Sequence, residues 1–397
     1  MSEDPTAVEQ EGTGKFFVPS LFMSRFTGNP PSTLLSLLLI EIGLTFGLQV
    51  GIVGQISAAN SFVALIASLI MGALSVRFNH KRLLMTGLII RTISAATCAF
   101  STSYYALLLF FSLNGIGMAL VAPMTMSITA ERLQSKERAT AIGWLIMAMP
   151  VSSIIGSLAI NYIANFGGWR LPFLAFILPI NVLSLIFVMV GVPSSRNRST
   201  LSGDAGIFKG FAETLSNRSA LACLIGAVFS AMSIGGFLVY QASFFRQRYQ
   251  VSMGFASLMF IGNALFMAFG SRFAGRYMRS VGSRRLWTLA MVLGGASIVS
   301  ALIVPNIWVS LILALIVNFQ LGLALTSANS LTLDQIPSFR GTIMSLFTAA
   351  NSMGMTFGAS LGGMILITSS YGSLGVFLGL VSLLAAFIVY FWAYERT

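Results

Sequence analysis

Residues 75–84 read SVRFNHKRLL, a cluster of basic side chains between two long apolar runs. Charged residues are scarce elsewhere, since Asp, Glu, Lys and Arg together make up 9% of the 397 positions. A second basic cluster, GRYMRSVGSRRLW at 275–287, follows about 200 residues later and also separates two apolar runs. The two clusters indicate a chain built from two copies of one design.

The apolar runs predict an integral membrane protein. Hydrophobic residues account for 56% of the chain, which is more than a soluble domain normally contains. A helix needs about 20 mostly apolar residues to cross the hydrocarbon core of a bilayer, where lipid offers the backbone no hydrogen-bond partner. We therefore predict an all-α integral membrane fold. Its twelve transmembrane helices are predicted at 35–55, 58–76, 83–102, 105–127, 140–164, 172–192, 219–243, 254–275, 286–304, 307–331, 342–368 and 373–393.

Lysine and arginine predict the orientation of these helices, because loops on the cytoplasmic side of a membrane are enriched in both. With both termini in the cytoplasm, all but four of the 23 Lys and Arg residues fall on the cytoplasmic side. The exceptions are Arg91 in the third helix, and Arg170, Arg246 and Arg248 outside. Membrane topology thus explains the net charge of +12, and nucleic acid is not an expected partner. We expect a monomer in the lipid bilayer of the cell membrane.

No cofactor or metal is expected. The two cysteines, Cys98 and Cys223, lie singly in different apolar segments, and His80 is the only histidine. These residues provide neither a disulfide framework nor a set of metal ligands. No nucleophile, base and orienting group form a recognisable catalytic motif, so an enzyme is not predicted. Residues 1–15 are acidic and polar, and no cleavable signal peptide is expected there.

A second pair of loops supports the repeat. TAERLQSKERAT at 129–140 and TLDQIPSFRGT at 332–342 place an acidic residue and an arginine at matching positions. A shared offset in two independent loops predicts two six-helix repeats. Because each repeat has an even number of spans, both repeats have the same orientation in the membrane. In the tail, KFFVPSLFMSRF at 15–26 is expected either to be disordered or to lie in the membrane interface. The predicted organisation is a cytoplasmic N-terminal tail at 1–33, an N-terminal bundle at 34–192, a cytoplasmic linker at 193–218 and a C-terminal bundle at 219–397.

Two motifs resemble those of a known family. GALSVRFNHKRLL at 72–84 resembles the loop signature Gly-x-x-x-Asp-Arg-x-Gly-Arg-Arg of the major facilitator superfamily, although Val76 stands at its aspartate position. GGWRLPF at 167–173 resembles the entry to the sixth helix in drug-exporter-like members. The resemblance covers residues 35–395. It implies a twelve-helix fold of two six-helix pseudo-symmetric bundles, in which helices 1, 4, 7 and 10 line a central pathway.

Two charged side chains lie deep within predicted spans, where a charge is costly and usually has a function. Glu41 lies in the first predicted helix and Arg91 near the middle of the third. One hypothesis makes Glu41 a proton-coupling or substrate site, because a buried carboxyl without a counter-ion binds a proton more readily. The alternative is a static ion pair between Glu41 and Arg91 that holds the N-terminal bundle together.

Uncharged polar side chains in the apolar segments are candidates for a substrate cavity, because amides and hydroxyls hydrogen-bond to ligands. They also bond membrane helices to one another, which is the alternative for each of them. The candidates are Thr45, Gln55, Asn114, Tyr240, Gln241, Asn263, Gln320 and Asn351.

The loops also predict a cytoplasmic gate that latches the outward-open state. Arg77 is expected to bond to Glu131 or Glu137, in place of the missing loop aspartate. Arg276 is expected to bond to Asp334 for the same reason. The predicted gate residues are Arg77, Glu131, Glu137, Arg138, Arg276, Asp334 and Arg340.

Together these features predict a secondary active transporter that moves a small, amphipathic or apolar molecule by alternating access. The leading hypothesis is proton-coupled efflux. The alternative is a proton-independent facilitator, a lipid-type translocator or a metabolite uptake carrier of the same fold. A membrane scaffold or receptor without transport is a third class, which the repeated gate loops disfavour.

Overall fold

The computed structural model describes residues 15–133, 135–193, 212–336 and 340–395, and no β-strand occurs within these ranges. Most of the predicted linker and the first 14 residues of the predicted tail therefore lie outside the described residues. The helices are α1 (Phe17–Phe26), α2 (Pro30–Phe46), α3 (Val50–Val53), α4 (Gln55–Arg77), α5 (His80–Ala99), α6 (Tyr104–Arg132), α7 (Ser135–Gly167), η1 (Gly168–Arg170), η2 (Phe173–Ile177), α8 (Leu178–Gly191), α10 (Arg218–Arg248), α11 (Met253–Val281), α12 (Ser283–Ile303), α13 (Ile307–Gln335), α14 (Arg340–Thr368) and α15 (Tyr371–Trp392).

Helix length and composition fit a membrane-spanning chain. Ten helices among the described residues are long and apolar enough to cross a bilayer. Each predicted span after the first coincides with a helix, and many of these helices are longer than predicted. For example, α10 continues to Arg248, past the predicted end at residue 243, because helical hydrogen bonding does not stop where the apolar side chains do.

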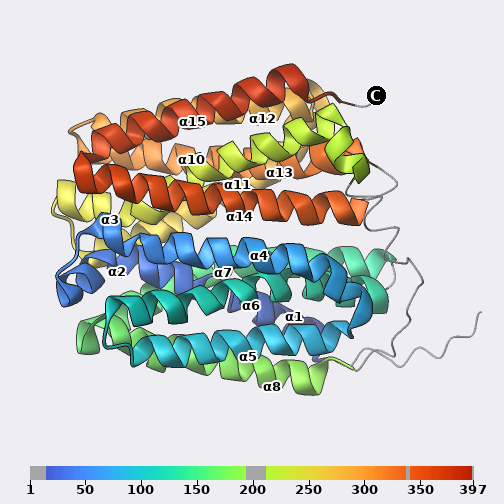
Figure 1. The fold of residues 1–397 in the computed structure, drawn as a ribbon, viewed down its shortest axis with the longest axis horizontal. Helices are drawn as coiled ribbons and strands as arrows, with labels where there is room; N and C mark the ends of the chain where they lie inside the picture. Colours follow the sequence, from blue (N-terminus) through green and yellow to red (C-terminus); the bar gives the residue numbers. More distant parts are fainter. Residues whose placement is uncertain (1–14, 134, 194–211, 337–339, 396–397) are drawn as a thin grey trace, which may run out of the picture.

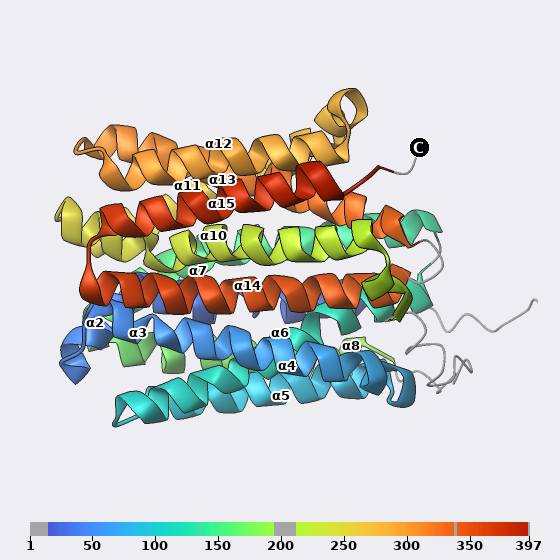
Figure 2. The same cartoon turned by 45° about the horizontal axis from the view of Figure 1, so that its top comes forward.

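The helices form two bundles that lie side by side, as Figures 1 and 2 show. The N-terminal bundle contains α1 to α8 and the C-terminal bundle contains α10 to α15. The same contacts recur in both: α5 packs on α6 and α8 as α12 packs on α13 and α15, and α4 packs on α6 as α11 packs on α13. Between the bundles, α2 contacts α10, α4 contacts α14, and α7 contacts α11. These recurring contacts confirm the predicted two-bundle fold.

The first membrane helix differs from the prediction. It consists of α1 and α2, which are separated by a break at residues 27–29. Because α1 packs against α6, α7 and α8, residues 17–33 belong to the N-terminal bundle. The predicted first span at 35–55 therefore begins too late, and the assignment of residues 17–33 to a disordered or interfacial tail is wrong.

The local sequence explains the break. Pro30 and Pro31 occupy the first turn of α2, where a missing N–H group removes no helical hydrogen bond, and a proline disfavours the helical conformation in the residue before it. At the end of α1, the backbone N–H of Thr27 donates to Met23 and that of Gly28 donates to Arg25. The prolines thus start a new helix inside a segment that crosses the bundle.

The two ends of the structure are named here from their predicted orientation. The inner end carries the turn between α4 and α5 and the described C-terminal residues, and it lies on the right in Figure 1. The outer end lies on the left. Its turns are at residues 47–49, 100–103, 249–252, 304–306 and 369–370.

Candidate functional site

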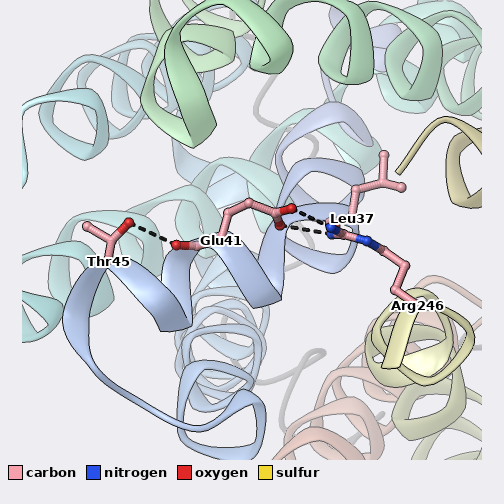
Figure 3. Close-up of polar contacts among 4 residues, drawn as sticks. All are labelled: Leu37, Glu41, Thr45 and Arg246. Carbon is pink, nitrogen blue, oxygen red and sulfur yellow. Dashed lines mark hydrogen bonds and ion pairs between the residues drawn. The ribbon is translucent and has the colours of Figure 1, made fainter. Parts of the chain in front are cut away.

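An ion pair joins the two bundles near the outer end (Figure 3). Glu41 lies in the last two turns of α2, and Arg246 lies in the last turn of α10. Arg246 donates from Nη1 to Oε2 of Glu41 over 2.9 Å and from Nη2 to Oε1 over 2.5 Å. Arg246 Nη1 also donates to the backbone oxygen of Leu37 over 3.0 Å. One guanidinium therefore binds both the carboxylate and the backbone of the opposite bundle.

The surroundings of this pair make it stronger than a typical surface ion pair. The side chains of Arg246 and Glu41 are only 14% and 29% exposed. Exposed pairs contribute about 0–1 kcal/mol, whereas hydrogen bonds to charged groups contribute about 1.5–3 kcal/mol. Because Nε of Arg246 is buried without a hydrogen-bond partner among the described residues, Glu41 is the main compensation for this charge.

Further hydrogen bonds close the same end. The Ser36 hydroxyl on α2 donates to the backbone oxygens of Leu238 and Val239 on α10, over 2.9 and 3.0 Å. Gln55 Nε2, at the start of α4, donates to the backbone oxygen of Ser360 on α14 over 3.1 Å. These hydrogen bonds between the two bundles lie in the outer half of the structure. We call this set of contacts the outer gate.

Two glycines bring the backbones of the two bundles together at the outer gate. A Cβ atom on Gly51 of α3 would lie 2.3 Å from the backbone oxygen of Gly363 on α14. A Cβ atom on Gly363 would lie 2.3 Å from the backbone oxygen of Gly51. Neither position therefore accepts a side chain without separating the bundles.

The inner end has a different set of contacts. His80 Nδ1 lies 2.6 Å from Oε1 of Glu131, so the histidine reaches the acid that was predicted to bond to Arg77. Arg138 donates from Nε and Nη2 to the backbone oxygen of Leu133, over 3.1 and 3.0 Å. These contacts all lie within the N-terminal bundle.

The other predicted gate residues whose side chains the structure describes form no latch in this conformation. Arg276 and Asp334 are both exposed and form no ion pair with each other, so this predicted bond is absent in the described structure. Glu137 is also exposed. The side chains of Arg77 and Arg340 lie outside the described part of the chain, and their bonds stay predictions.

Arg91 occupies a buried polar cluster in the N-terminal bundle and does not contact Glu41. Its side chain is 2% exposed. Nε donates to Oδ1 of Asn114 over 3.2 Å, and Nη2 donates to the backbone oxygen of Thr27 at the break. Asn114 in turn donates to Oδ1 of Asn60 over 3.2 Å. The alternative of a static Glu41–Arg91 pair is therefore wrong, because the partner of Glu41 comes from the other bundle.

Two predicted cavity residues belong to the outer end instead. Thr45 is exposed there, donating to the backbone oxygen of Glu41 over 2.8 Å and accepting from Trp169 Nε1 over 3.0 Å. Gln55 is part of the outer gate. Tyr240, a third cavity candidate, packs beside Gly54, the neighbour of Gln55. Its hydroxyl donates to the backbone oxygen of Ala359 over 2.7 Å, and a Cβ atom on Gly54 would lie 2.1 Å from that hydroxyl.

The remaining cavity candidates lie in the C-terminal bundle. Gln241 and Asn263 exchange hydrogen bonds of 3.5 and 3.1 Å, and Asn318 donates to Asn263 over 3.0 Å. These buried amides bond α10, α11 and α13 to one another. Asn351 donates to its own helix at Phe347, whereas Oε1 of Gln320 is buried without a hydrogen-bond partner among the described residues.

Sequence reasoning missed three features of the site. Arg246 was assigned to an outer loop, although it lies close enough to the end of the apolar run for one more turn of the helix to include it. Arg25 was assigned to the tail. The segment Gly28–Pro31 signals a break between two helices, and this signal was compatible with a helix before the break that contains Arg25. Asn60 was not singled out, and only its position among apolar residues could have drawn attention to it.

Comparisons with known proteins agree with this architecture. The sequence profile of the Major Facilitator Superfamily matches residues 20–338 and 223–397. The "Probable 4-methylmuconolactone transporter" of Cupriavidus pinatubonensis is 27% identical over 303 residues, which cover 72% of this chain and 68% of that protein. "Multidrug resistance protein 2" of Bacillus subtilis is 22% identical and covers 79% of each chain. A bacterial homologue of the human lysosomal transporter Spinster, solved in an inward-facing and occupied conformation, superposes with a TM-score of 0.75 at 16% identity over 94% of this chain and 95% of that one.

Two bundles that repeat one contact pattern and meet at a gate define a membrane transporter. The chain belongs to the major facilitator superfamily, whose profile matches nearly all of it. The family and the relatives are transporters of small molecules and not enzymes.

Proposed function

We propose that this protein is a proton-coupled secondary active transporter that works by alternating access, and that the ion pair between Glu41 and Arg246 holds its outer gate closed. The observation that carries the proposal is that the carboxylate of Glu41 bonds to the opposite bundle. Opening the outer end must break this bond. The charge state of Glu41 is therefore linked to the conformation of the whole protein.

Proton coupling follows from this link. Protonation of Glu41 removes its negative charge and weakens two charge-assisted hydrogen bonds to Arg246. A proton taken up from outside thus favours opening of the outer gate, and its release favours closure. The expected basic loops on the cytoplasmic side support an orientation with both termini in the cytoplasm of the cell.

The direction of transport is proposed from the relatives. Relatives named as multidrug resistance proteins support efflux of a small, amphipathic or apolar molecule. A relative named as a methylmuconolactone transporter supports the alternative, a carrier of a metabolite in either direction. A proton-independent facilitator or a lipid-type translocator is the other alternative, and it predicts no role for the charge of Glu41.

Spin labels at the two ends test the proposed gating. An outer pair at Thr102 and Ile303 and an inner pair at Phe78 and Ser280 use exposed positions on opposite bundles. Distances are measured by electron–electron double resonance in proteoliposomes, in a variant without Cys98 and Cys223. Alternating access predicts that the outer distances lengthen as the inner ones shorten. If both pairs keep fixed distances at every pH and with every ligand, the protein does not alternate.

Transport itself tests the coupling. Compounds that raise the unfolding temperature of the purified protein are loaded into proteoliposomes, with and without an imposed pH gradient. The proposal predicts that the gradient drives transport in the native protein and that Glu41→Gln abolishes this drive. Gradient-driven transport by Glu41→Gln at the native rate would support the facilitator alternative.

A further inference from the structure

Arg25 carries a guanidinium group with no hydrogen-bond or ion-pair partner among the described residues. It lies on α1, two residues before the break in the first membrane helix. Its Nε atom is buried and has no hydrogen-bond partner, and no hydrogen bond or ion pair joins its side chain to the described residues. Arg25 as a whole is only partly buried.

Arg91 adds a second positive charge near Arg25, since its Nη2 bonds to the backbone oxygen of Thr27, two residues further along the chain. Its hydrogen bonds go to neutral acceptors, the side chain of Asn114 and the backbone of Thr27. A Cβ atom on Gly117 of α6 would lie 2.1 Å from Cγ of Arg91, so the side chain is wedged against that helix. Arg91 is thus fixed in place, whereas no described residue accepts a hydrogen bond from the guanidinium of Arg25.

No carboxylate of the described residues neutralises this pair. Each lies at an end of a helix, in the linker region or in the outer gate: Glu41, Glu131, Glu137, Glu213, Asp334 and Glu395. Lipid phosphates are also remote, because Arg25 and Arg91 lie roughly 12 and 16 Å from the inner ends of α1 and α5 at 1.5 Å per residue. Uncompensated charges at this depth are costly and usually bind something.

We propose that Arg25 and Arg91 form the recognition site for a carboxylate group, so that the transported molecule is an amphipathic organic anion. A planar guanidinium with free donors binds a carboxylate by two parallel hydrogen bonds. Arg25 makes that contact, and Arg91 acts as a positioning residue that holds the helix break and adds to the positive potential. The inference rests on the proposed function, since it names the substrate class of the transporter.

The apolar part of the ligand follows from α1 itself. Phe22 lies three residues before Arg25 and so shares its helix face. Its ring lies 6.4 Å from that of Phe26, centroid to centroid. An aromatic monocarboxylate therefore matches the site, with its ring beside Phe22 and its charge on Arg25. With the outer gate closed, such a ligand enters from the inner end.

Binding of matched acids and amides tests the inference. The full-length protein in detergent is titrated with benzoate and 1-naphthoate, with benzamide and 1-naphthamide as neutral counterparts, at constant ionic strength. The unfolding temperature is measured at each concentration. We expect at least one acid to raise the unfolding temperature at a concentration at least tenfold lower than its amide. Equal effects of acid and amide in both pairs would overturn the inference.

Variants then locate the site. Arg25→Gln is expected to weaken the protection by the acid at least tenfold, and Arg25→Lys to restore most of it. Arg248→Gln, which removes an exposed arginine at the outer end, is the matched control and is expected to bind as the native protein does. Unchanged protection in Arg25→Gln would place the acid elsewhere and reject the site.

Three further outcomes separate this inference from a phosphate site and from the proposed function. Phenyl phosphate that protects more strongly than benzoate would reassign the site to phosphate esters, and the carboxylate inference would be wrong. Failure of acid binding together with normal spin-label gating would reject the substrate class and leave the proposed function intact. Fixed spin-label distances with tight acid binding would instead leave the anion site and reject alternating access.

Discussion

The carboxylate of Glu41 and the guanidinium of Arg246 join the two bundles by two hydrogen bonds, of 2.9 and 2.5 Å. The two residues lie 205 positions apart in the chain, one in each repeat. Each stands near the outer end of the first helix of its bundle. The pair therefore connects the two copies of the repeat at equivalent helices.

Neutralising Glu41 is expected to open the outer gate. Glu41→Gln keeps the shape of the side chain but loses the charge, and a hydrogen bond to a charged group contributes about 1.5–3 kcal/mol. The outer-open population, measured with the outer spin-label pair, should rise at least about tenfold. Glu213→Gln, at an exposed position just before α10, serves as the control and should leave the population unchanged.

Exchange of the two charges tests whether the pair itself matters. Glu41→Arg and Arg246→Glu should each open the outer gate, because each places like charges in contact. The double variant should recover a large part of the closed population, and the coupling is read from the double-mutant cycle. If the effects of the two changes simply add, the residues do not interact in the membrane.

Acidification should act through the same carboxylate. The bonds to Arg246 need the negative charge of Glu41, so a proton delivered to this carboxylate weakens the closed gate. The outer spin-label distances should therefore lengthen on acidification in the native protein and respond much less in Glu41→Gln. An equal response of both proteins would assign the pH dependence to another group.

The glycine contact gives a steric prediction. Gly363→Ala places a methyl group 2.3 Å from the backbone oxygen of Gly51, which forces the bundles apart at the outer end. The inner-open population should fall, as measured by the inner spin-label pair. Gly143→Ala is the matched control, since nothing lies within 4 Å of its Cβ position. If Gly363→Ala has the same inner-open population as the native protein, the two backbones need not meet at this point.

Removal of Asn114 should destabilise the N-terminal bundle. Asn114→Ala deprives Nε of Arg91 of its acceptor, and an unsatisfied buried group costs about 1–3 kcal/mol. The unfolding temperature in detergent should drop clearly. Asn351→Ala removes an amide that bonds only to its own helix and should change the unfolding temperature little. A similar drop for both variants would argue against the Arg91 cluster.

The sequence predicted the number of bundles, their repeat and most helices, because an uninterrupted apolar run has few structural alternatives in a membrane. The first helix was misplaced for a physical reason. Its inner half contains Arg25 and ends before Gly28–Pro31, so this half does not form an uninterrupted apolar run of membrane-spanning length. Packing against α7 and α8 nevertheless holds it in the bundle.

The candidate site was predicted only in part. Glu41 was recognised because a carboxylate is rare in an apolar run, but its partner could not be found from local patterns. Arg246 lies beyond the apolar run of α10 and comes into reach of Glu41 only through packing of the two bundles. The contact between His80 and Glu131 was not predicted either, since proximity across a turn is decided in three dimensions.

The break at residues 27–29 has a consequence for biogenesis. α2 has 17 residues, or about 25 Å. This is shorter than the hydrocarbon core of roughly 30 Å that a helix must span when it leaves the translocon for the lipid. α1 supplies the missing length but brings Arg25, which raises the free energy of insertion. This segment is thus a poor membrane anchor by itself, and its integration depends on helices that follow it in the chain, α6, α7 and α8, which enclose it in the folded protein.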